Sequence, residues 1–256
     1  MSTLPFLLLP PAIGAAVVIG LACGAVASAQ TTPGAADRVY FDRAHGEGPV
    51  PEPMAALATR LGFAIHEGTG PIDAATLRGA RLVYVRAPVA EFTDPERAAL
   101  IAFVQGGGSL LVVVDEEQRQ KLAVTRLNDV LAPFGLTLTG DTPYLHNTGG
   151  VSRAGEVAKG AYELPYSGGR AIEGGTPFAW QLDAEGRPAQ PFAAYATAQG
   201  GGRVIAIGEG MATVFLGTPD GKRLTGQPRD ARNTVYWGKD SELFMADVFS
   251  WLLPKN

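Results

Sequence analysis

Short apolar runs alternate with amphipathic stretches from residue 38 to residue 138. Runs rich in Val, Ile, Leu, Tyr and Phe predict buried strands, at residues 38–41, 63–66, 81–85, 110–114 and 134–138. Apolar residues three or four positions apart predict helices between them, at residues 54–61, 93–105 and 122–131, with a single helical turn at 73–77. This order predicts an α/β domain with a mostly parallel sheet flanked by helices, of flavodoxin-like type.

The periodicity disappears over residues 139–190, which are rich in Gly, Pro, Tyr and Asn. We expect a long loop or hairpin insertion there, a feature that is often functional in α/β proteins. Residues 192–198 and 203–207 flank three glycines and predict an antiparallel hairpin. Residues 241–253 predict a last helix, with Leu243 on its core-facing side.

Aromatic side chains are frequent in and after the insertion. We expect Tyr162, Tyr166 and Trp180 to pack the insertion onto the sheet, together with Tyr195 on the strand that follows. Residues 236–237, Tyr-Trp, lie just before the last helix, from where they could reach a cleft at the sheet edge.

Residues 1–29 are uncharged and strongly apolar. Their apolar run at 12–26 and a closing Ala-Ser-Ala indicate a signal peptide, cleaved after Ala29. A polar linker at 30–37 and one domain at 38–256 would follow. This organisation predicts a periplasmic or secreted protein. An uncleaved N-terminal membrane anchor is the alternative, because about 18–20 apolar residues span a bilayer.

Composition and charge exclude several kinds of functional site. Cys23 is the only cysteine; it could end a lipoprotein signal, and after cleavage at Ala29 the chain would have no disulfide and no thiol nucleophile. The formal net charge of −4 and the lack of a basic patch exclude ordinary nucleic-acid binding. We expect no metal and no cofactor, because metal-ligand spacings are missing and the glycine runs do not open helices as phosphate loops do.

Three motifs carry a resemblance to a known fold family. VYFDRAHGEG (39–48) predicts a first strand that ends in Asp and is followed by His-Gly. LVYVRAP (82–88) precedes FTDPERAALIAFVQGGGSLLVVVD (92–115), and GGGRVIAIGEG (200–210) precedes KDSELFMADVFSWLL (239–253). In this order the motifs resemble the class I glutamine-amidotransferase-like fold. The resemblance is closer to its non-catalytic branch in gliding-motility and intraflagellar-transport proteins.

The chain departs from the catalytic members of that family at the chemical positions. The resemblance places a nucleophilic cysteine where this chain has Asp115, and a His-x-Glu pair near the C-terminus, where no histidine follows His146. Glutaminase chemistry needs a thiolate and a base, so the chain is not a glutamine amidotransferase. The resemblance implies a binding module for sugars or peptides, and the sequence favours such a domain over an enzyme.

Polar residues follow the predicted strands at their carboxyl ends, where α/β sheets place ligand sites. The expected ligand-binding residues, including two from the insertion, are Asp42, His45, Arg86, Asp115, Glu116, His146, Asn147 and Glu209. Their side chains could hydrogen-bond a polar ligand or perform acid–base chemistry. Alternatively, Asp42 and Asp115 cap the turns that follow them and pair with Arg86.

Three functional hypotheses follow. The main one is an exported, non-catalytic domain that binds a glycan or cell-wall fragment, or a peptide, at the carboxyl ends of the strands. A hydrolase would instead use Asp115 or Glu209 as base, His45 as acid and Arg86 to hold an anion. The third is a membrane-associated accessory subunit of a transport or motility complex.

Overall fold

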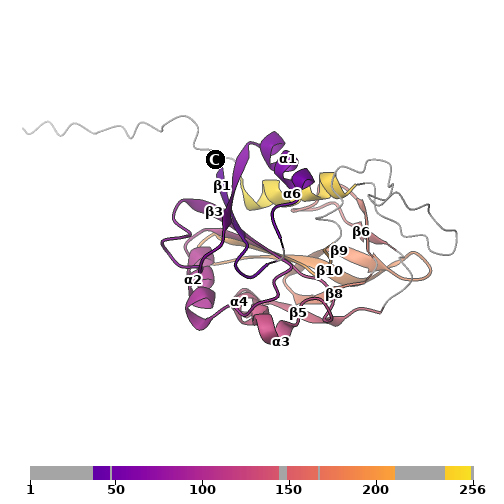
Figure 1. Cartoon of the computed structure of the whole chain (residues 1–256). Coiled ribbons are helices and arrows are strands. Elements are labelled where there is room, and N and C mark those ends of the chain that lie inside the picture. The colour runs from indigo at the N-terminus through magenta and orange to yellow at the C-terminus, as the bar shows by residue number, and fades with distance from the viewer. Residues whose placement is uncertain (1–36, 47, 144–148, 167, 211–239, 255–256) are drawn as a thin grey trace, which may run out of the picture. The chain divides into compact units, whose positions relative to one another are not determined.

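The computed structural model describes residues 37–46, 48–143, 149–166, 168–210 and 240–254 (Figure 1). The predictions for the signal peptide or anchor and for the linker therefore lie outside the described residues, except for Asp37. The same holds for His146, Asn147 and residues 236–237.

A mixed sheet forms the centre of the fold. Its strands lie in the order β2-β1-β3-β4-β11-β10-β9-β6-β7. Their bounds, in that order, are Phe63–Gly68, Asp37–Asp42, Ala80–Arg86, Ser109–Val113, Arg203–Ile207, Pro188–Thr197, Thr176–Leu182, Gly150–Ser152 and Glu163–Leu164. The strands from β2 to β11 pair in parallel, whereas those from β11 to β7 pair antiparallel. The prediction of a mostly parallel sheet thus holds for one half, and the predicted hairpin of β10 and β11 is confirmed.

The described part of the insertion supplies strands, and β6 and β7 form an antiparallel pair, which agrees with the hairpin form of the prediction. It contributes β6, β7 and β9 to the main sheet, and β8 (Arg170–Gly174) to a second, two-stranded sheet with β5 (Leu136–Asp141). The strand predicted at 134–138 is therefore not part of the parallel sheet. Gly135, with φ of 71°, turns the chain out of a short 3-10 helix and directs β5 toward β8.

Helices cover both faces of the main sheet, as Figure 1 shows. One face carries α1 (Glu52–Leu61) and α6 (Ser241–Leu252), and the other carries α2 (Asp94–Gln105), α3 (Leu122–Thr125) and α4 (Leu127–Leu131). The single helix predicted at 122–131 is divided at Arg126, whose φ of 62° is left-handed. Within the described segments, no helix has the length and apolarity needed to cross a membrane.

Local signals set the ends of two helices as predicted. At α2 the Thr93 N–H and hydroxyl both donate to Glu96 Oε2, at 2.9 and 2.7 Å, which forms the expected capping interaction. At α1 the left-handed Gly62 closes the helix through its N–H, which donates to the Ala58 and Thr59 carbonyls.

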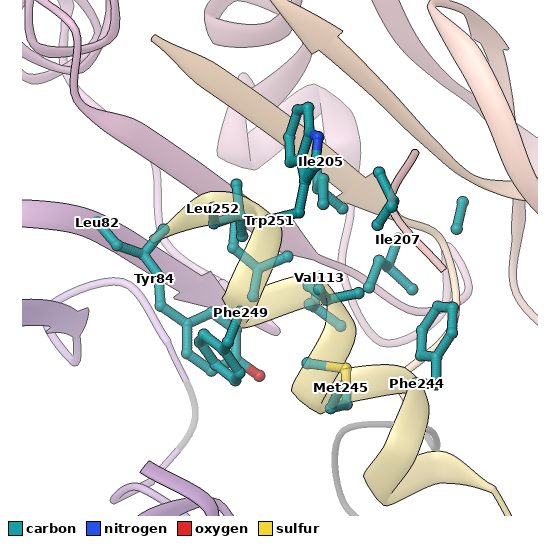
Figure 2. Packing of buried hydrophobic residues seen from close by; sticks show 14 of the residues in the cluster. Leu82, Tyr84, Val113, Ile205, Ile207, Phe244, Met245, Phe249, Trp251 and Leu252 are labelled. Atoms are coloured by element: carbon teal, nitrogen blue, oxygen red, sulfur yellow. The ribbon is translucent and has the colours of Figure 1, made fainter. Parts of the chain in front are cut away.

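Strand periodicity divides the core into two clusters. Side chains two residues apart share a face, so Leu82 and Tyr84 pack under α1 and α6, whereas Val83 and Val85 pack under α2 and α4. Figure 2 shows α6 on the first face, with side chains such as Phe244 and Phe249 turned toward the sheet. Leu243 is 55% exposed, so its predicted core position is wrong; it lies on the solvent side of α6.

Candidate functional site

Asp115 lies in a turn that begins where β4 ends. Its N–H donates to Gln120 Oε1, and its own Oδ1 accepts the N–H of Glu116 at 3.0 Å. Arg119 forms ion pairs with Asp115 at 3.4 Å and with Glu116 at 3.3 Å. This is the turn-capping role of the alternative interpretation, with Arg119 rather than Arg86 as the cation.

Arg170, from β8, holds this turn from inside the protein. Its side chain is 1% exposed. The guanidinium donates to three backbone carbonyls, those of Asp115 (2.8 Å), Thr139 (3.1 Å) and Gln120 (2.7 Å). It also donates to Glu117 Oε2 at 2.5 Å. A buried charge is tolerated when its donors are satisfied in this way, so the arginine is a structural clamp on the Asp115 turn.

His45 lies in a second polar cluster, between two carboxylates. Its Nδ1 is 3.1 Å from Asp42 Oδ2, and its Nε2 is 3.3 Å from Glu96 Oε1. All three side chains are buried, and the imidazole stacks on Phe92 with ring centroids 4.1 Å apart. The His45 carbonyl accepts the N–H of Val89 at 2.7 Å. The cluster therefore joins the loops after β1 and β3 to the first turn of α2.

The two carboxylates make this histidine basic. Burial alone would lower the pKa of His45, but its hydrogen bond to Asp42 and the charges of Asp42 and Glu96 outweigh that effect and raise the pKa. Burial opposes ionisation of Glu96 too, yet its bonds from Thr93 and Ile72 and the nearby His45 lower its pKa. The charges in this cluster are therefore paired with one another.

The sheet separates the two clusters. Arg86 pairs in register with Val113, and Val113 with Ile207, so these side chains share the α6 face. Alternation places Asp115 and Glu209 on that face as well. Asp42 instead continues the face of Tyr40, which packs toward α2. The structure thus brings Asp42 and His45 together, and groups Asp115 with Glu116 and Glu209 elsewhere.

The α6-face group lies around a buried phenol. Burial raises the pKa of Tyr166, and the charges of Glu209, Asp115 and Glu116 raise it further, which places those carboxylates near it. The Glu209 side chain is fully buried. Arg86 Nε is buried and has no hydrogen-bond partner among the described residues. A ligand-binding role for this group stays a prediction.

Carboxylates also fasten the insertion to α6. Glu156 accepts hydrogen bonds from the Tyr195 hydroxyl and from Trp251 Nε1, each at 3.0 Å. Asp247 accepts the Tyr162 hydroxyl at 2.7 Å. The expected packing of Tyr162 and Tyr195 is confirmed, but the two acidic partners were not predicted. No local pattern identifies them, whereas the capping motif at α2 identifies Glu96 as the residue that caps the helix.

The two triple-glycine turns meet at the opposite, amino edge of the sheet. They line a cavity of about 340 Å³ with Arg81, Ser109 and Arg203. The N–H groups of Gly106, Gly107 and Gly108 already donate to α2 carbonyls, so they are not available to a phosphate. The polar side chains likewise bind carbonyls at the end of α6. This cavity is a helix-capping arrangement.

No group of three or more His, Cys, Asp or Glu side chains suited to a metal ion occurs in the part of the chain that the structure describes. His66, on β2, is exposed and lies near the ring of Tyr40, with centroids 6.3 Å apart.

Parts of this chain are similar to known proteins in sequence and in structure. The model of the IFT52 GIFT domain matches residues 54–144. Among solved structures, the chain is similar to "mmIFT52 N-terminal domain", with a TM-score of 0.61 and 16% identity over 84% of this chain and 96% of that one. A β-galactosidase from Rahnella sp. R3 is similar with a TM-score of 0.53 and 14% identity, over 85% of this chain and 30% of that one. No curated protein matches.

These comparisons correct part of the sequence analysis. They support an intraflagellar-transport-type domain and suggest the amidotransferase-like fold only weakly. The prediction of an exported glycan-binding domain is contradicted by the IFT52 GIFT match, and so are the signal peptide and the periplasmic or secreted location. The alternative of an N-terminal membrane anchor stays a prediction. The match agrees better with the third hypothesis, an accessory subunit of a transport or motility complex.

Proposed function

We propose that this chain is an accessory subunit of a transport or motility complex of the intraflagellar-transport type, in which its α/β domain serves as an interaction module. The observation that carries the proposal is the match of residues 54–144 to the IFT52 GIFT domain. The similarity to the mmIFT52 N-terminal domain extends over most of the chain and supports a shared architecture.

The chemistry of the carboxyl edge is in keeping with binding rather than turnover. A general acid needs a proton that can reach a substrate, but both ring nitrogens of His45 face carboxylates of the protein itself. Asp115 caps its turn and pairs with Arg119. We infer that these residues shape the loops, and that Arg86 is the group at this edge best placed to contact a partner.

We also propose that residues 38–256 act as one amidotransferase-like domain. Within it, the matched segment runs from α1 through β5 and precedes the strands β6 to β9. Three strands of the parallel half, β2, β3 and β4, lie in the matched segment, and the surface that binds partners would be sought there.

The test is the state of the full chain in its own cells. The tagged chain is cross-linked in vivo, purified under mild conditions, and analysed by size-exclusion chromatography and quantitative mass spectrometry. We expect it in an assembly well above its own mass of 26.7 kDa, with the same partners at constant ratios. Arg86→Gln should lower partner recovery, whereas Arg187→Gln, on an exposed turn, should not. Recovery of the chain as a monomer under all conditions would overturn the proposal.

A further inference from the structure

Arg86, the last residue of β3, is a cation that the described part of the chain does not neutralise. Its side chain forms no hydrogen bond or ion pair with a described residue, and its Nε is buried. An unmet buried donor is uncommon in folded proteins and needs an explanation. The other buried or half-buried arginines each donate to a carboxylate or to a backbone carbonyl; they are Arg38, Arg43, Arg81, Arg97, Arg170 and Arg203.

The turn after Arg86 holds a strained backbone. Ala87 has a φ of 48°, a left-handed conformation that a residue with a Cβ rarely adopts. The Ala87 N–H donates to the Val113 carbonyl at 2.8 Å, and the Val89 N–H donates to the His45 carbonyl at 2.7 Å. Strained residues persist where the surrounding structure holds them, and they are common at ligand-binding sites. These bonds fix the backbone from which the Arg86 side chain projects.

The loop after β1 also supports this turn. A Cβ at Gly46 would lie 2.8 Å from the Arg86 carbonyl oxygen and 3.1 Å from the Asp42 carbonyl oxygen, so a larger residue would push the two loops apart. His45, next to this glycine, is fixed between Asp42 and Glu96. Folding therefore orders the turn before a ligand arrives, which lowers the entropy cost of binding.

The guanidinium itself is prepared for an anion. Binding removes water from a charged group, and this removal opposes association. At Arg86 the fold has already excluded water from Nε, whereas the two Nη groups are not among the buried atoms and the residue as a whole is half-buried. An oxyanion would approach the two Nη groups end-on, and each of two oxygens would accept one N–H.

The charges around Arg86 favour a ligand with a single negative charge. The carboxylates of Asp115, Glu116 and Glu209 belong to the same α6-face group. Asp115 and Glu116 are paired with Arg119, at 3.4 and 3.3 Å. Coulomb repulsion grows with charge, so these carboxylates oppose a phosphate dianion more strongly than a carboxylate. One guanidinium in these surroundings therefore suits a carboxylate.

We propose that Arg86 binds a carboxylate of a partner protein, an Asp or Glu side chain, through its two Nη groups, and that the strained turn at Ala87 holds the guanidinium in position for it. This proposal rests on the proposed function and names the chemical group that would be recognised at this edge of the sheet.

The test is an NMR titration of the full chain labelled with nitrogen-15, in which the Nε–H signal of Arg86 reports on the guanidinium. The probe is the α-amide of N-acetylaspartate. The matched probe is the α-amide of N-acetylasparagine, which has the same shape and no charge. We expect the aspartate probe to shift the signal to saturation and the asparagine probe to bind at least about tenfold more weakly. Equal shifts with both probes, or no shift with either, would overturn the proposal.

Inorganic phosphate, at the same ionic strength, distinguishes the two classes of oxyanion. We expect it to bind at Arg86 more weakly than the aspartate probe, because of the carboxylates on the same face of the sheet. Tighter binding of phosphate than of the aspartate probe would overturn the assignment of a carboxylate.

Variants that change charge locate the site, with the backbone amide signal of Ala87 as the readout. Arg86→Gln removes the guanidinium, whereas Arg78→Gln makes the same change in net charge in the exposed turn before β3. We expect Arg86→Gln to weaken binding of the aspartate probe at least about tenfold, and Arg78→Gln to bind like the parent. Arg86→Lys keeps the charge without the paired N–H groups, so it should also bind more weakly than the parent. An equal effect of the two Gln variants would show attraction by net charge alone and would overturn the site.

A second pair of variants tests the turn. Gly46→Ala keeps the guanidinium but displaces the turn, whereas a Cβ at Gly70 meets nothing within 4 Å. We expect Gly46→Ala to weaken binding of the aspartate probe at least about tenfold, and Gly70→Ala to leave it unchanged. Circular dichroism checks that both variants fold. Parent-like binding by a folded Gly46→Ala variant would overturn the role of the turn; if that variant does not fold, Arg86→Lys decides whether the geometry of the guanidinium matters.

The outcome is separable from that of the proposed function. If the aspartate probe binds at Arg86 but the parent chain is monomeric in cells, the subunit role fails and the carboxylate site stands. If the assembly is recovered from cells but the aspartate probe does not bind, the carboxylate site fails and the subunit role stands. Unchanged partner recovery in Arg86→Gln would overturn the partner as the source of the carboxylate.

Discussion

Replacing Arg170 by methionine should lower the stability of the whole domain. The side chain is 1% exposed, and its guanidinium donates to the carbonyls of Asp115, Thr139 and Gln120 and to the Glu117 carboxylate. Methionine has a similar length but no donor, so three backbone carbonyls lose their partner at once. The turn that carries Asp115 and the strand β5 would both lose an anchor.

The magnitude follows from the groups left behind. A buried polar group without a partner costs about 1–3 kcal/mol, and breaking a buried ion pair from one side costs about 3–5 kcal/mol. Water can reach part of the turn, because Glu117 is 49% exposed. We therefore expect a loss of about 3–5 kcal/mol in the free energy of unfolding. At about 2–4 °C per kcal/mol for a chain of this size, the Tm should fall by about 6–20 °C.

Urea unfolding followed by circular dichroism measures this loss. Arg170→Lys keeps the charge but not the planar fork, so it should recover only part of the stability, with a loss of about 2 kcal/mol. The matched control is Arg187→Met, because the Arg187 side chain is 70% exposed and pairs with Asp183 and Glu185 on the surface; its loss should stay below about 1 kcal/mol. A loss below about 1 kcal/mol for Arg170→Met would refute the clamp.

Three further predictions concern other parts of the fold. The pKa of His45 is raised in the folded chain, so its charged form stabilises the fold fully below the usual histidine pKa of about 6.5, and this stabilisation is lost as the pH rises through the raised value. The difference in unfolding free energy between the parent and His45→Asn should therefore shrink from acid to alkaline pH. A difference that stays constant with pH would contradict the pairing. Gly200→Ala places a Cβ 1.8 Å from the Gln105 carbonyl oxygen, whereas a Cβ at Gly140 meets nothing within 4 Å. In thermal unfolding, Gly200→Ala should lower the Tm strongly, and the control Gly140→Ala should lower it by no more than a few degrees. Burial and the hydrogen bond to Asp247 raise the pKa of Tyr162 to about 12. Asp247→Asn should lower the pKa of Tyr162, while burial keeps that pKa above about 10. Tyrosinate absorbance measures the change, and an unchanged titration would exclude the bond.

Much of the parallel half of the fold could be predicted from the chain alone. The strands β1 to β4 and the helix α2 carry local signals: apolar runs, a capping pair at Thr93 and Glu96, and glycines after the helices. Such signals depend on residues within a few positions of one another. The helix α6 was found for the same reason, although the exposed side of Leu243 was not.

The grouping of the candidate site residues could not be predicted from the sequence. Asp42 and Asp115 both follow strands at the same edge, and sequence order suggested one group. Side-chain alternation, counted in the paired register, places them on opposite faces. Residues such as Arg170 and Glu156 act through partners more than thirty positions away. No spacing in the sequence marks contacts of that range.

By itself, the sequence determined the local elements and the carboxylate of Asp115 directly after the strand that became β4. The tertiary structure decided that the described residues between 149 and 190 contribute strands, that the sheet is mixed, and that the polar edge divides into two clusters. The physical reason is the separation of the interacting residues along the sequence. Helix caps and apolar periodicity involve residues close together in the chain, whereas strand order, register and the pairing of buried charges depend on which distant segments meet.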